Sequence, residues 1–190
     1  MSRGPGAQRG LTRPFGMRKM LHMQVRSTSM RGGIVIRRAV ARDVKRLTRL
    51  VRGSRAYGGQ YAAMVADYRV GPDYVETHRV FVAVDAGDSE GRVLGFYSLV
   101  LVPPELELLF VEDGMQGRGI GRLLVEHMKA EARAAGLDRV RVVSHPPAEG
   151  FYRSVGALLT GTVSANPPAV AWDRPELELA LTSTNARRAF

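Results

Sequence analysis

The 190-residue sequence has no cysteine, which excludes disulfides, thiolate metal ligands and a cysteine nucleophile. It also lacks a run of about 18 apolar residues, the length that a membrane-spanning helix needs. The apolar part of its first residues is too short and too polar for a secretory signal. These absences predict a soluble, cytoplasmic protein, and the length suits a single domain that buries its own core.

Acidic residues are absent from positions 1–42, where ten of the 28 Lys and Arg residues lie. The other 18 basic residues are balanced by 18 acidic ones, so the net charge of +10 belongs to the N-terminal segment. Residues 1–32 are rich in Gly, Arg and Ser and poor in large apolar side chains, which predicts a basic, flexible tail. We therefore expect one domain over residues 33–190, whose neutrality argues against nucleic acid as a partner.

From Ile34 onward, apolar residues recur with alternating strand-like and helix-like spacing. A Gly- and Asp-rich turn at residues 85–91 joins two strand-like runs as a hairpin, which implies antiparallel pairs. The expected fold class is α/β, with a mixed sheet covered by helices on both faces. Strands are predicted at residues 34–38, 79–84, 92–102, 105–111, 139–144, 157–163 and 176–181, and helices at residues 44–51, 57–70, 119–135 and 148–156, with a break at 71–73.

The stretch MQGRGIGRLL at residues 115–124 places three glycines just before the longest predicted helix. A P-loop needs Lys and then Ser or Thr after its last glycine, and a dinucleotide fingerprint needs another glycine at 122 or 124, so neither pattern matches. What remains is Gln116-x-x-Gly119-x-Gly121 between a strand and a helix. The first turn of a helix has unpaired N–H groups and a partial positive charge, so this junction suits a pyrophosphate. A flexible turn without a ligand is the alternative.

This motif resembles the acetyl-coenzyme A motif of the GNAT superfamily of N-acetyltransferases, Gln/Arg-x-x-Gly-x-Gly/Ala. A second block, SHPPAEGFYRSVGA at residues 144–157, is similar to the superfamily's later Ala-x-x-Phe-Tyr motif, although Pro147 stands where the family often has Asn. The resemblance extends from about Ile34 to Leu181. It implies a mostly antiparallel sheet, opened next to its fourth strand for coenzyme A, and an acyltransferase that uses acetyl-coenzyme A as co-substrate and no metal.

The resemblance also assigns the coenzyme A contacts. Backbone groups of the fourth strand are expected to pair with the pantetheine arm, and the glycine-rich loop to hold the pyrophosphate. Arg118 and Arg122 either bind that pyrophosphate or remain solvated at the helix start. The expected cofactor-binding residues are Leu109, Phe110, Val111, Gln116, Gly117, Arg118, Gly119, Ile120, Gly121, Arg122, Ala148, Phe151 and Tyr152.

The expected catalytic residues are one tyrosine and two glutamates. The resemblance places Tyr152 where the superfamily's general acid protonates the departing thiolate, and packing in the core is the other interpretation. Glu105 and Glu107 share one face of a strand because they are two residues apart. Glu105 stands where several family members have their catalytic carboxylate, so it ranks first as the base and Glu107 second, directly or through a water. Surface charge or pairing with a nearby Arg is the alternative for both.

The function implied is transfer of an acetyl group to a primary amine, expected to be that of a small molecule, by direct attack through a tetrahedral intermediate. Tyr57, Tyr61 and Tyr68 are candidates for the wall of the acceptor pocket or for a buried helix face. Acetylation of a protein or peptide amine, and coenzyme A binding without catalysis, remain alternatives. The histidines show no metal-ligand spacing, and only His145 lies beside the expected site. A homodimer is compatible with the sequence.

Overall fold

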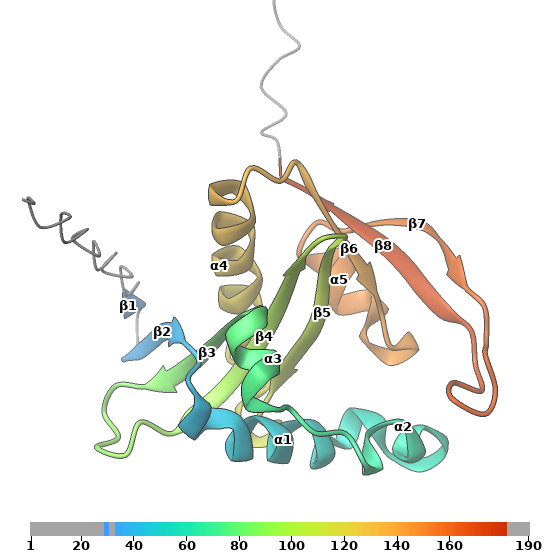
Figure 1. The fold of residues 1–190 in the computed structure, drawn as a ribbon. Helices are drawn as coiled ribbons and strands as arrows, with labels where there is room; N and C mark the ends of the chain where they lie inside the picture. The colour runs from blue at the N-terminus through green and yellow to red at the C-terminus, as the bar shows by residue number, and fades with distance from the viewer. Residues whose placement is uncertain (1–28, 31–32, 182–190) are drawn as a thin grey trace, which may run out of the picture.

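In the computed structural model, which describes residues 29–30 and 33–181, eight strands form one mixed sheet (Figure 1). Their spatial order is β1-β2-β3-β4-β5-β6-β8-β7, and neighbours are antiparallel except β5 and β6, which are parallel. The predicted mixed, mostly antiparallel sheet is thus confirmed. The strands are β1 (Ser29–Met30), β2 (Ile34–Arg38), β3 (Arg79–Asp85), β4 (Val93–Leu101), β5 (Pro104–Val111), β6 (Arg139–Val143), β7 (Leu158–Val163) and β8 (Arg174–Ala180).

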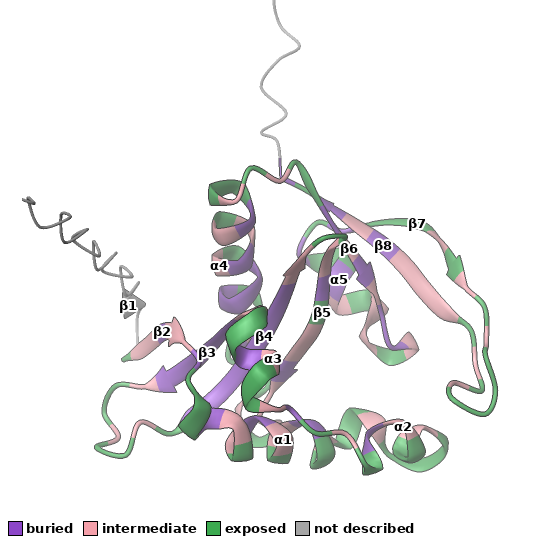
Figure 2. Cartoon of the chain, viewed as in Figure 1, coloured by how far each residue is buried: buried purple, intermediate pink, exposed green. Residues whose placement is uncertain are grey.

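Helices cover both faces of the sheet, as predicted (Figure 1). Alternate residues of β3 divide between the two cores: Val80 and Val82 pack with α1, α2 and α3, whereas Phe81 and Ala83 pack with α4 and α5. Buried residues accordingly line both the sheet and the inner side of α4 (Figure 2). The helices are α1 (Val44–Arg52), α2 (Ala62–Ala66), α3 (Pro72–Thr77), α4 (Ile120–Ala134) and α5 (Glu149–Ser154).

The strands β5 and β6 separate soon after they meet. They pair only at Glu105 and Arg141, and Figure 1 shows them diverging from there. A bulge in the β4–β5 ladder leaves Glu107 as an extra residue opposite Ser98 and Leu99. Among the described residues, no strand pairs with the remainder of β5 on the β6 side, which confirms the predicted opening next to this strand, the fourth one predicted from the sequence.

The segment between α1 and β3 differs from the helix predicted over residues 57–70. It forms single 3-10 turns at Arg55–Tyr57 and Gly59–Tyr61 before the short α2. Gly59 has a φ of 63°, which interrupts a right-handed helix. The predicted break at 71–73 is right at Gly71, which is extended, but it ends there because α3 begins at Pro72. Proline suits the first position of a helix, where its missing N–H leaves no bond unmade.

The predicted basic tail, residues 1–32, lies outside the described residues apart from β1, which pairs with β2. The predicted domain is described as far as Leu181. In this described part, no helix is both long and apolar enough to cross a membrane.

Asp43 is a buried carboxylate that joins β2 to α1. Arg37 donates two hydrogen bonds to it, of 2.7 and 2.9 Å, and the Val40 N–H donates a third of 2.9 Å. Burial alone would raise the pKa of Asp43, but these hydrogen bonds outweigh burial and the net pKa is lowered. The stabilisation is therefore present above the unfolded-state pKa of about 3.9 and is lost as the pH falls through the folded-state pKa.

We expect Asp43→Asn to reduce the free energy of unfolding by about 2 kcal/mol at pH 7, since it removes hydrogen bonds to a charged acceptor. The difference in unfolding free energy between the variant and the wild type should shrink near pH 3. At that pH the unfolded wild type binds a proton at Asp43, which reduces the stabilisation that the ionised carboxylate gives. Urea denaturation at both pH values measures this. An equal difference at the two pH values would contradict the electrostatic account.

Candidate active site

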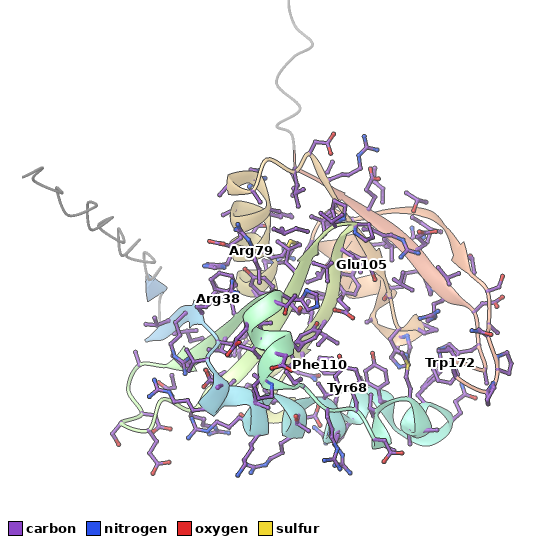
Figure 3. All side chains as sticks on the ribbon, in the orientation of Figure 1. Arg38, Tyr68, Arg79, Glu105, Phe110 and Trp172 are labelled. Carbon is purple, nitrogen blue, oxygen red and sulfur yellow. The ribbon has the colours of Figure 1, made fainter. Side chains whose placement is uncertain are left out.

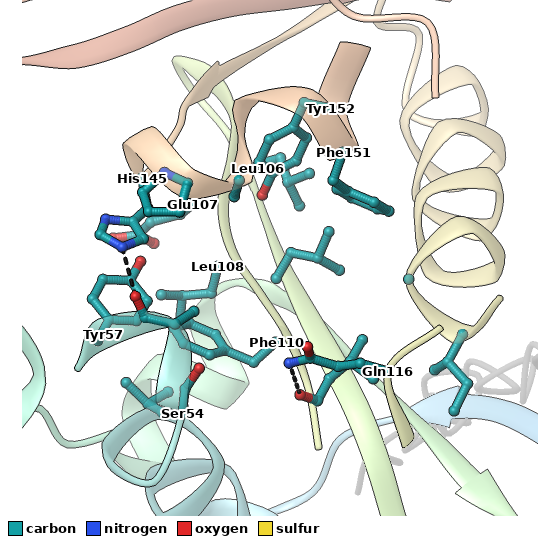
Figure 4. A pocket seen from close by; sticks show the side chains of 18 of the residues that line it. Ser54, Tyr57, Leu106, Glu107, Leu108, Phe110, Gln116, His145, Phe151 and Tyr152 are labelled. Carbon is teal, nitrogen blue, oxygen red and sulfur yellow. Dashed lines mark hydrogen bonds between the residues drawn. The ribbon is translucent and has the colours of Figure 1, made fainter. Parts of the chain in front are cut away.

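A cavity of about 740 Å³ lies along the open edge of β5 (Figure 4). Its walls come from β5, the glycine-rich loop and first turn of α4, the region around α5, and the segment between α1 and α3. Both sequence motifs therefore contribute to one cavity. The residues predicted from sequence that line it are Glu105, Glu107, Leu109, Phe110, Val111, Gln116, Gly117, Gly119, Ile120, Gly121, Arg122, Ala148, Phe151 and Tyr152.

The structure places Arg118 outside this lining. It lies between Gly117 and Gly119, both of which have positive φ, and its side chain is exposed. The alternative in which Arg118 stays solvated therefore fits the structure better than a contact with a ligand in the cavity.

The glycine-rich loop exposes bare backbone at the start of α4. Gly117 has a φ of 74°, and Gly119, the N-cap of the helix, has a φ of 81°. Apart from the adjacent residues of the chain, no described atom lies within 4 Å of the position that a Cβ would take at either glycine. No described side chain caps the helix, so the first N–H groups of α4 can bind an anion.

Gly121 lacks a side chain for a different reason: the first turn of α4 and the Phe151 ring pack closely at this position. A Cβ at this position would lie 3.1 Å from two ring carbons of Phe151. The first turn of α4 thus packs directly on α5, and Arg122 adds a hydrogen bond of 3.2 Å to the carbonyl oxygen of Ser154. Glycine at 121 therefore brings the two motifs into contact.

The side chain of Gln116 holds the start of the glycine-rich loop against the end of β5 through two hydrogen bonds. Its Nε2 donates to Asp113 Oδ1 at 3.1 Å and to the Val111 carbonyl oxygen at 3.4 Å. Asp113 also accepts hydrogen bonds of 3.0 and 3.2 Å from the backbone N–H and Nε of Arg55. The loop is thereby tied both to the end of β5 and to the segment after α1.

Tyr152 lies on α5 and is 8% exposed. Figure 4 shows its hydroxyl directed toward β5, and no hydrogen bond joins that hydroxyl to another described residue. Burial raises the pKa of Tyr152, so the hydroxyl keeps its proton at neutral pH. A protonated hydroxyl without a protein acceptor can donate its proton to a ligand in the cavity.

Glu105 is held by an ion pair. Nη1 of Arg141 lies 2.8 Å from Glu105 Oε2, and the same guanidinium also pairs with Glu176. The Glu105 side chain is 22% exposed, and the other two members of the triad are 40% and 30% exposed. The alternative in which Glu105 pairs with a nearby Arg is thus present in the structure, although the residue also lines the cavity.

Glu107 instead has one hydrogen-bond partner among the described residues, and that partner is neutral. The Tyr74 hydroxyl lies 2.6 Å from Glu107 Oε2 and 2.6 Å from the buried Ser98 hydroxyl. Because a carboxylate can only accept, Tyr74 donates to Glu107. Burial, followed by the hydrogen bond to Glu107, raises the pKa of Tyr74. Glu107 is exposed, lines the cavity, and has no ion pair within the described chain.

Aromatic rings form the end of the cavity away from the glycine-rich loop (Figure 4). The Tyr57 ring stacks on His145 with centroids 4.3 Å apart, and on Phe110 at 5.7 Å. Tyr68 also lines the cavity. Tyr61 does not, but its ring meets His145 edge-on at 4.2 Å. Of the three tyrosines predicted as candidates for an acceptor wall, Tyr57 and Tyr68 thus line the cavity and Tyr61 does not.

Two residues at the aromatic end of the cavity, Trp172 and Arg174, were not among those predicted from the sequence. Trp172 lies on the segment that leads into β8, beside the α2 region, and its ring meets Tyr61 edge-on at 4.6 Å (Figure 3). Arg174 begins β8 and lines the cavity. The one available signal was composition, because Trp172 is the single tryptophan of the chain.

The sequence pattern of the Acetyltransferase (GNAT) domain family matches residues 76–156 of this chain. The peptidyl-lysine N-acetyltransferase YjaB of Salmonella typhimurium is 31% identical over 108 residues, which are 57% of this chain. The match spans 66% of that relative, just under two thirds of its length. The family match includes the glycine-rich loop and α5.

Solved structures agree with this assignment. The structure of yncA from Salmonella typhimurium with its cofactor acetyl-CoA has a TM-score of 0.60 and 20% identity, covering 83% of this chain and 99% of that one. The solution structure of apo-form YjaB from Escherichia coli has a TM-score of 0.54 and 25% identity, covering 78% and 97%. Residues 76–156 therefore carry the pattern of an Acetyltransferase (GNAT) domain, and the chain has the fold of these two solved structures.

Proposed function

We propose that this protein transfers an acetyl group from acetyl-coenzyme A to a primary amine of a small molecule. One observation carries the proposal: the open edge of β5, the bare N-terminus of α4 and the hydroxyl of Tyr152 all face a single cavity. Each of the three suits a different part of a thioester ligand. The yncA structure, which resembles this fold, contains acetyl-CoA as its cofactor.

The described residues fit coenzyme A in two places. The pyrophosphate suits the N–H groups at the start of α4, where Gly117 and Gly119 leave the backbone uncovered. The pantetheine amides suit the unpaired edge of β5 from Leu109 to Val111, to which they can add as a strand would. This arrangement directs the thioester toward Tyr152 and the aromatic end.

The chemistry follows from the groups at that point. The amine nitrogen attacks the thioester carbonyl carbon and forms the C–N bond, and collapse of the tetrahedral intermediate breaks the C–S bond. Tyr152 donates its proton to the departing thiolate, and a carboxylate of β5 accepts the proton that the amine loses. The two proton transfers leave an amide and a free thiol.

Glu107 is the stronger candidate for the base, although the sequence ranked Glu105 first. Arg141 occupies a carboxylate oxygen of Glu105 in an ion pair, whereas the partner of Glu107 among the described residues is the neutral Tyr74 hydroxyl. Water can bridge the carboxylate to the amine. Tyr74 then acts as a positioning residue, because it orients Glu107 without lining the cavity.

We expect Glu107→Gln to lower kcat/KM for the amine about 100-fold at pH 7, within the range for loss of a general base. Glu105→Gln should lower it less than about 10-fold, since Arg141 keeps its pairing with Glu176. Steady-state kinetics measure both values, and melting temperatures check that each variant is folded. A larger loss for Glu105→Gln would restore the first ranking.

Free thiol release from acetyl-coenzyme A by the full chain tests the proposed function. The acceptor panel should hold small amines, amino acids and lysine-containing peptides, because the relative YjaB is named a peptidyl-lysine N-acetyltransferase. We expect release that depends on a small amine. Release with peptides alone would favour peptide acetylation, and tight coenzyme A binding without release would favour a binding module.

A further inference from the structure

Three buried polar atoms at the aromatic end of the cavity have no hydrogen-bond partner within the described residues. They are Nδ1 of His145, Nε1 of Trp172 and Nε of Arg174. In the described chain only one other buried side-chain atom, an oxygen of Glu112, shares this property. Buried polar groups are nearly always paired in folded proteins, so a cluster of unpaired ones marks a place where a ligand can supply the partners.

The pairing of β6 with β8 brings the segment around Arg174 next to His145. Val143 pairs with Glu176, and the Ser144 N–H donates to the Pro175 carbonyl oxygen at 2.8 Å, so the backbones of the next residues, His145 and Arg174, are adjacent. The Trp172 ring lies 6.4 Å from the His145 ring, and Tyr61 contacts both rings, at 4.6 and 4.2 Å. His145 and Arg174 also line the cavity, so the cluster borders the space that an acceptor would occupy.

Arg174 carries a positive charge that no described carboxylate neutralises. Its neighbour on the same face, Arg141, lies between Glu105 and Glu176 and pairs with both. The charge of Arg174 acts on Tyr57, a residue of the cavity wall. Burial raises the pKa of Tyr57, and the positive charge of Arg174 partly offsets that increase. Arg174 is therefore the cation of this face that remains available to a ligand.

The hydrogen-bonding character of the cluster selects an anion. Arg174 and Trp172 can only donate, and oxygen atoms of a carboxylate or phosphate accept from both. His145 donates from Nε2 to the Ala56 carbonyl oxygen at 2.8 Å, which leaves Nδ1 as an acceptor. Burial lowers the pKa of His145, so the ring is neutral at pH 7 and Nδ1 can receive an N–H or O–H of the same ligand.

We propose that Arg174 and Trp172, with His145 beside them, bind an anionic group of the acceptor, so that the substrate carries both a primary amine and a carboxylate or phosphate. This inference rests on the proposed function and deepens it. Glu107 faces the ammonium end of such a substrate, and Arg174 faces its anionic end. An amine without the anion would leave the donors of Arg174 and Trp172 unpaired, so the site discriminates against it.

Kinetics with matched acceptors test the subsite in the full chain. Each pair shares its amine and differs in the anion: tyrosine and tyramine, lysine and cadaverine, phosphoethanolamine and ethanolamine. We expect the anionic member of at least one pair to have the higher kcat/KM, and the preferred pair distinguishes carboxylate from phosphate. Arg174→Gln should reduce that advantage about 10- to 100-fold, the range for a charge-assisted hydrogen bond, without changing the KM for acetyl-coenzyme A.

Arg139→Gln is the matched control, because Arg139 is exposed on β6 and pairs with Glu178 away from the cavity. Arg139→Gln should leave unchanged the ratio of kcat/KM for the anionic acceptor to kcat/KM for the neutral one. Arg174→Lys should keep part of the preference for the anionic acceptor. Higher kcat/KM for the neutral member of every pair, or an equal loss for both members in Arg174→Gln, would overturn the inference while leaving the acetyltransferase function intact.

Fluorescence gives a readout that does not need turnover, because Trp172 is the single tryptophan. With coenzyme A present, the anionic member of the preferred pair should change the emission saturably, and Arg174→Gln should weaken this binding about 10-fold or more. No thiol release with any acceptor would contradict the proposed function, and the titration would still decide the subsite. An unchanged emission with every anionic probe, or equal binding of the neutral member, would overturn it.

Discussion

Tyr152→Phe should lower kcat about 100- to 1,000-fold, because the thiolate would then leave without a proton donor. The KM for acetyl-coenzyme A should stay within about threefold, since the ring that α5 contributes to the cavity wall is kept. Burial raises the pKa of Tyr152, so the wild type should show no loss of rate from this group as the pH rises to about 10. Steady-state kinetics between pH 6 and 10 measure these quantities.

Tyr97→Phe is the control for removal of a buried tyrosine hydroxyl. Tyr97 lies in the core outside the cavity lining, and its hydroxyl is 2.8 Å from His127 Nδ1. This variant should lose about 1 kcal/mol of unfolding free energy and keep its kcat. A Tyr152→Phe enzyme with wild-type kcat would contradict the acid role and leave Tyr152 as a packing residue.

Gly119→Ala should weaken coenzyme A binding about 10- to 100-fold. The φ of 81° at this N-cap is costly for alanine, by about 1–2 kcal/mol, so the loop should relax and turn the N–H groups of the first helical turn away from the pyrophosphate. Isothermal titration with coenzyme A measures the loss directly. kcat at saturating acetyl-coenzyme A should fall much less than the affinity.

The other end of α4 offers a matched control. Gly136 follows the helix with a φ of 80°, and a Cβ there would also meet no atom within 4 Å. Gly136→Ala should therefore cost a similar unfolding free energy while leaving coenzyme A affinity unchanged. Equal loss of affinity in both variants would mean that helix stability, and not the loop geometry, controls binding.

The architecture could be predicted from the sequence because its signals are local. Alternating residues such as Val80 and Phe81 identify strands, and glycines at 119 and 136 mark both ends of the long helix. The segment at 57–70 was mispredicted because its apolar spacing suited a helix while Gly59 interrupted the backbone. α3 departs from the prediction because Pro72 starts a helix there, although proline within a helix breaks it.

The lining of the candidate site could be predicted where a motif defines it, at the glycine-rich loop and at Tyr152, which the structure brings to one cavity. The partners of the carboxylates were not: Arg141 is 36 residues from Glu105, and Tyr74 is 33 residues from Glu107. Such pairs form only when the sheet brings distant strands and helices together, and no periodicity in the sequence encodes them. The cluster of Arg174, Trp172 and His145 could not be predicted from the sequence for the same reason.

The most direct test of the central claim is mass spectrometry of the acceptors after incubation of the full chain with acetyl-coenzyme A. The account predicts a small amine that gains one acetyl group, in an amount equal to the free thiol released, and a strongly reduced amount with Tyr152→Phe. Thiol release without an acetylated amine, or no product from any acceptor while coenzyme A binds tightly, would contradict it.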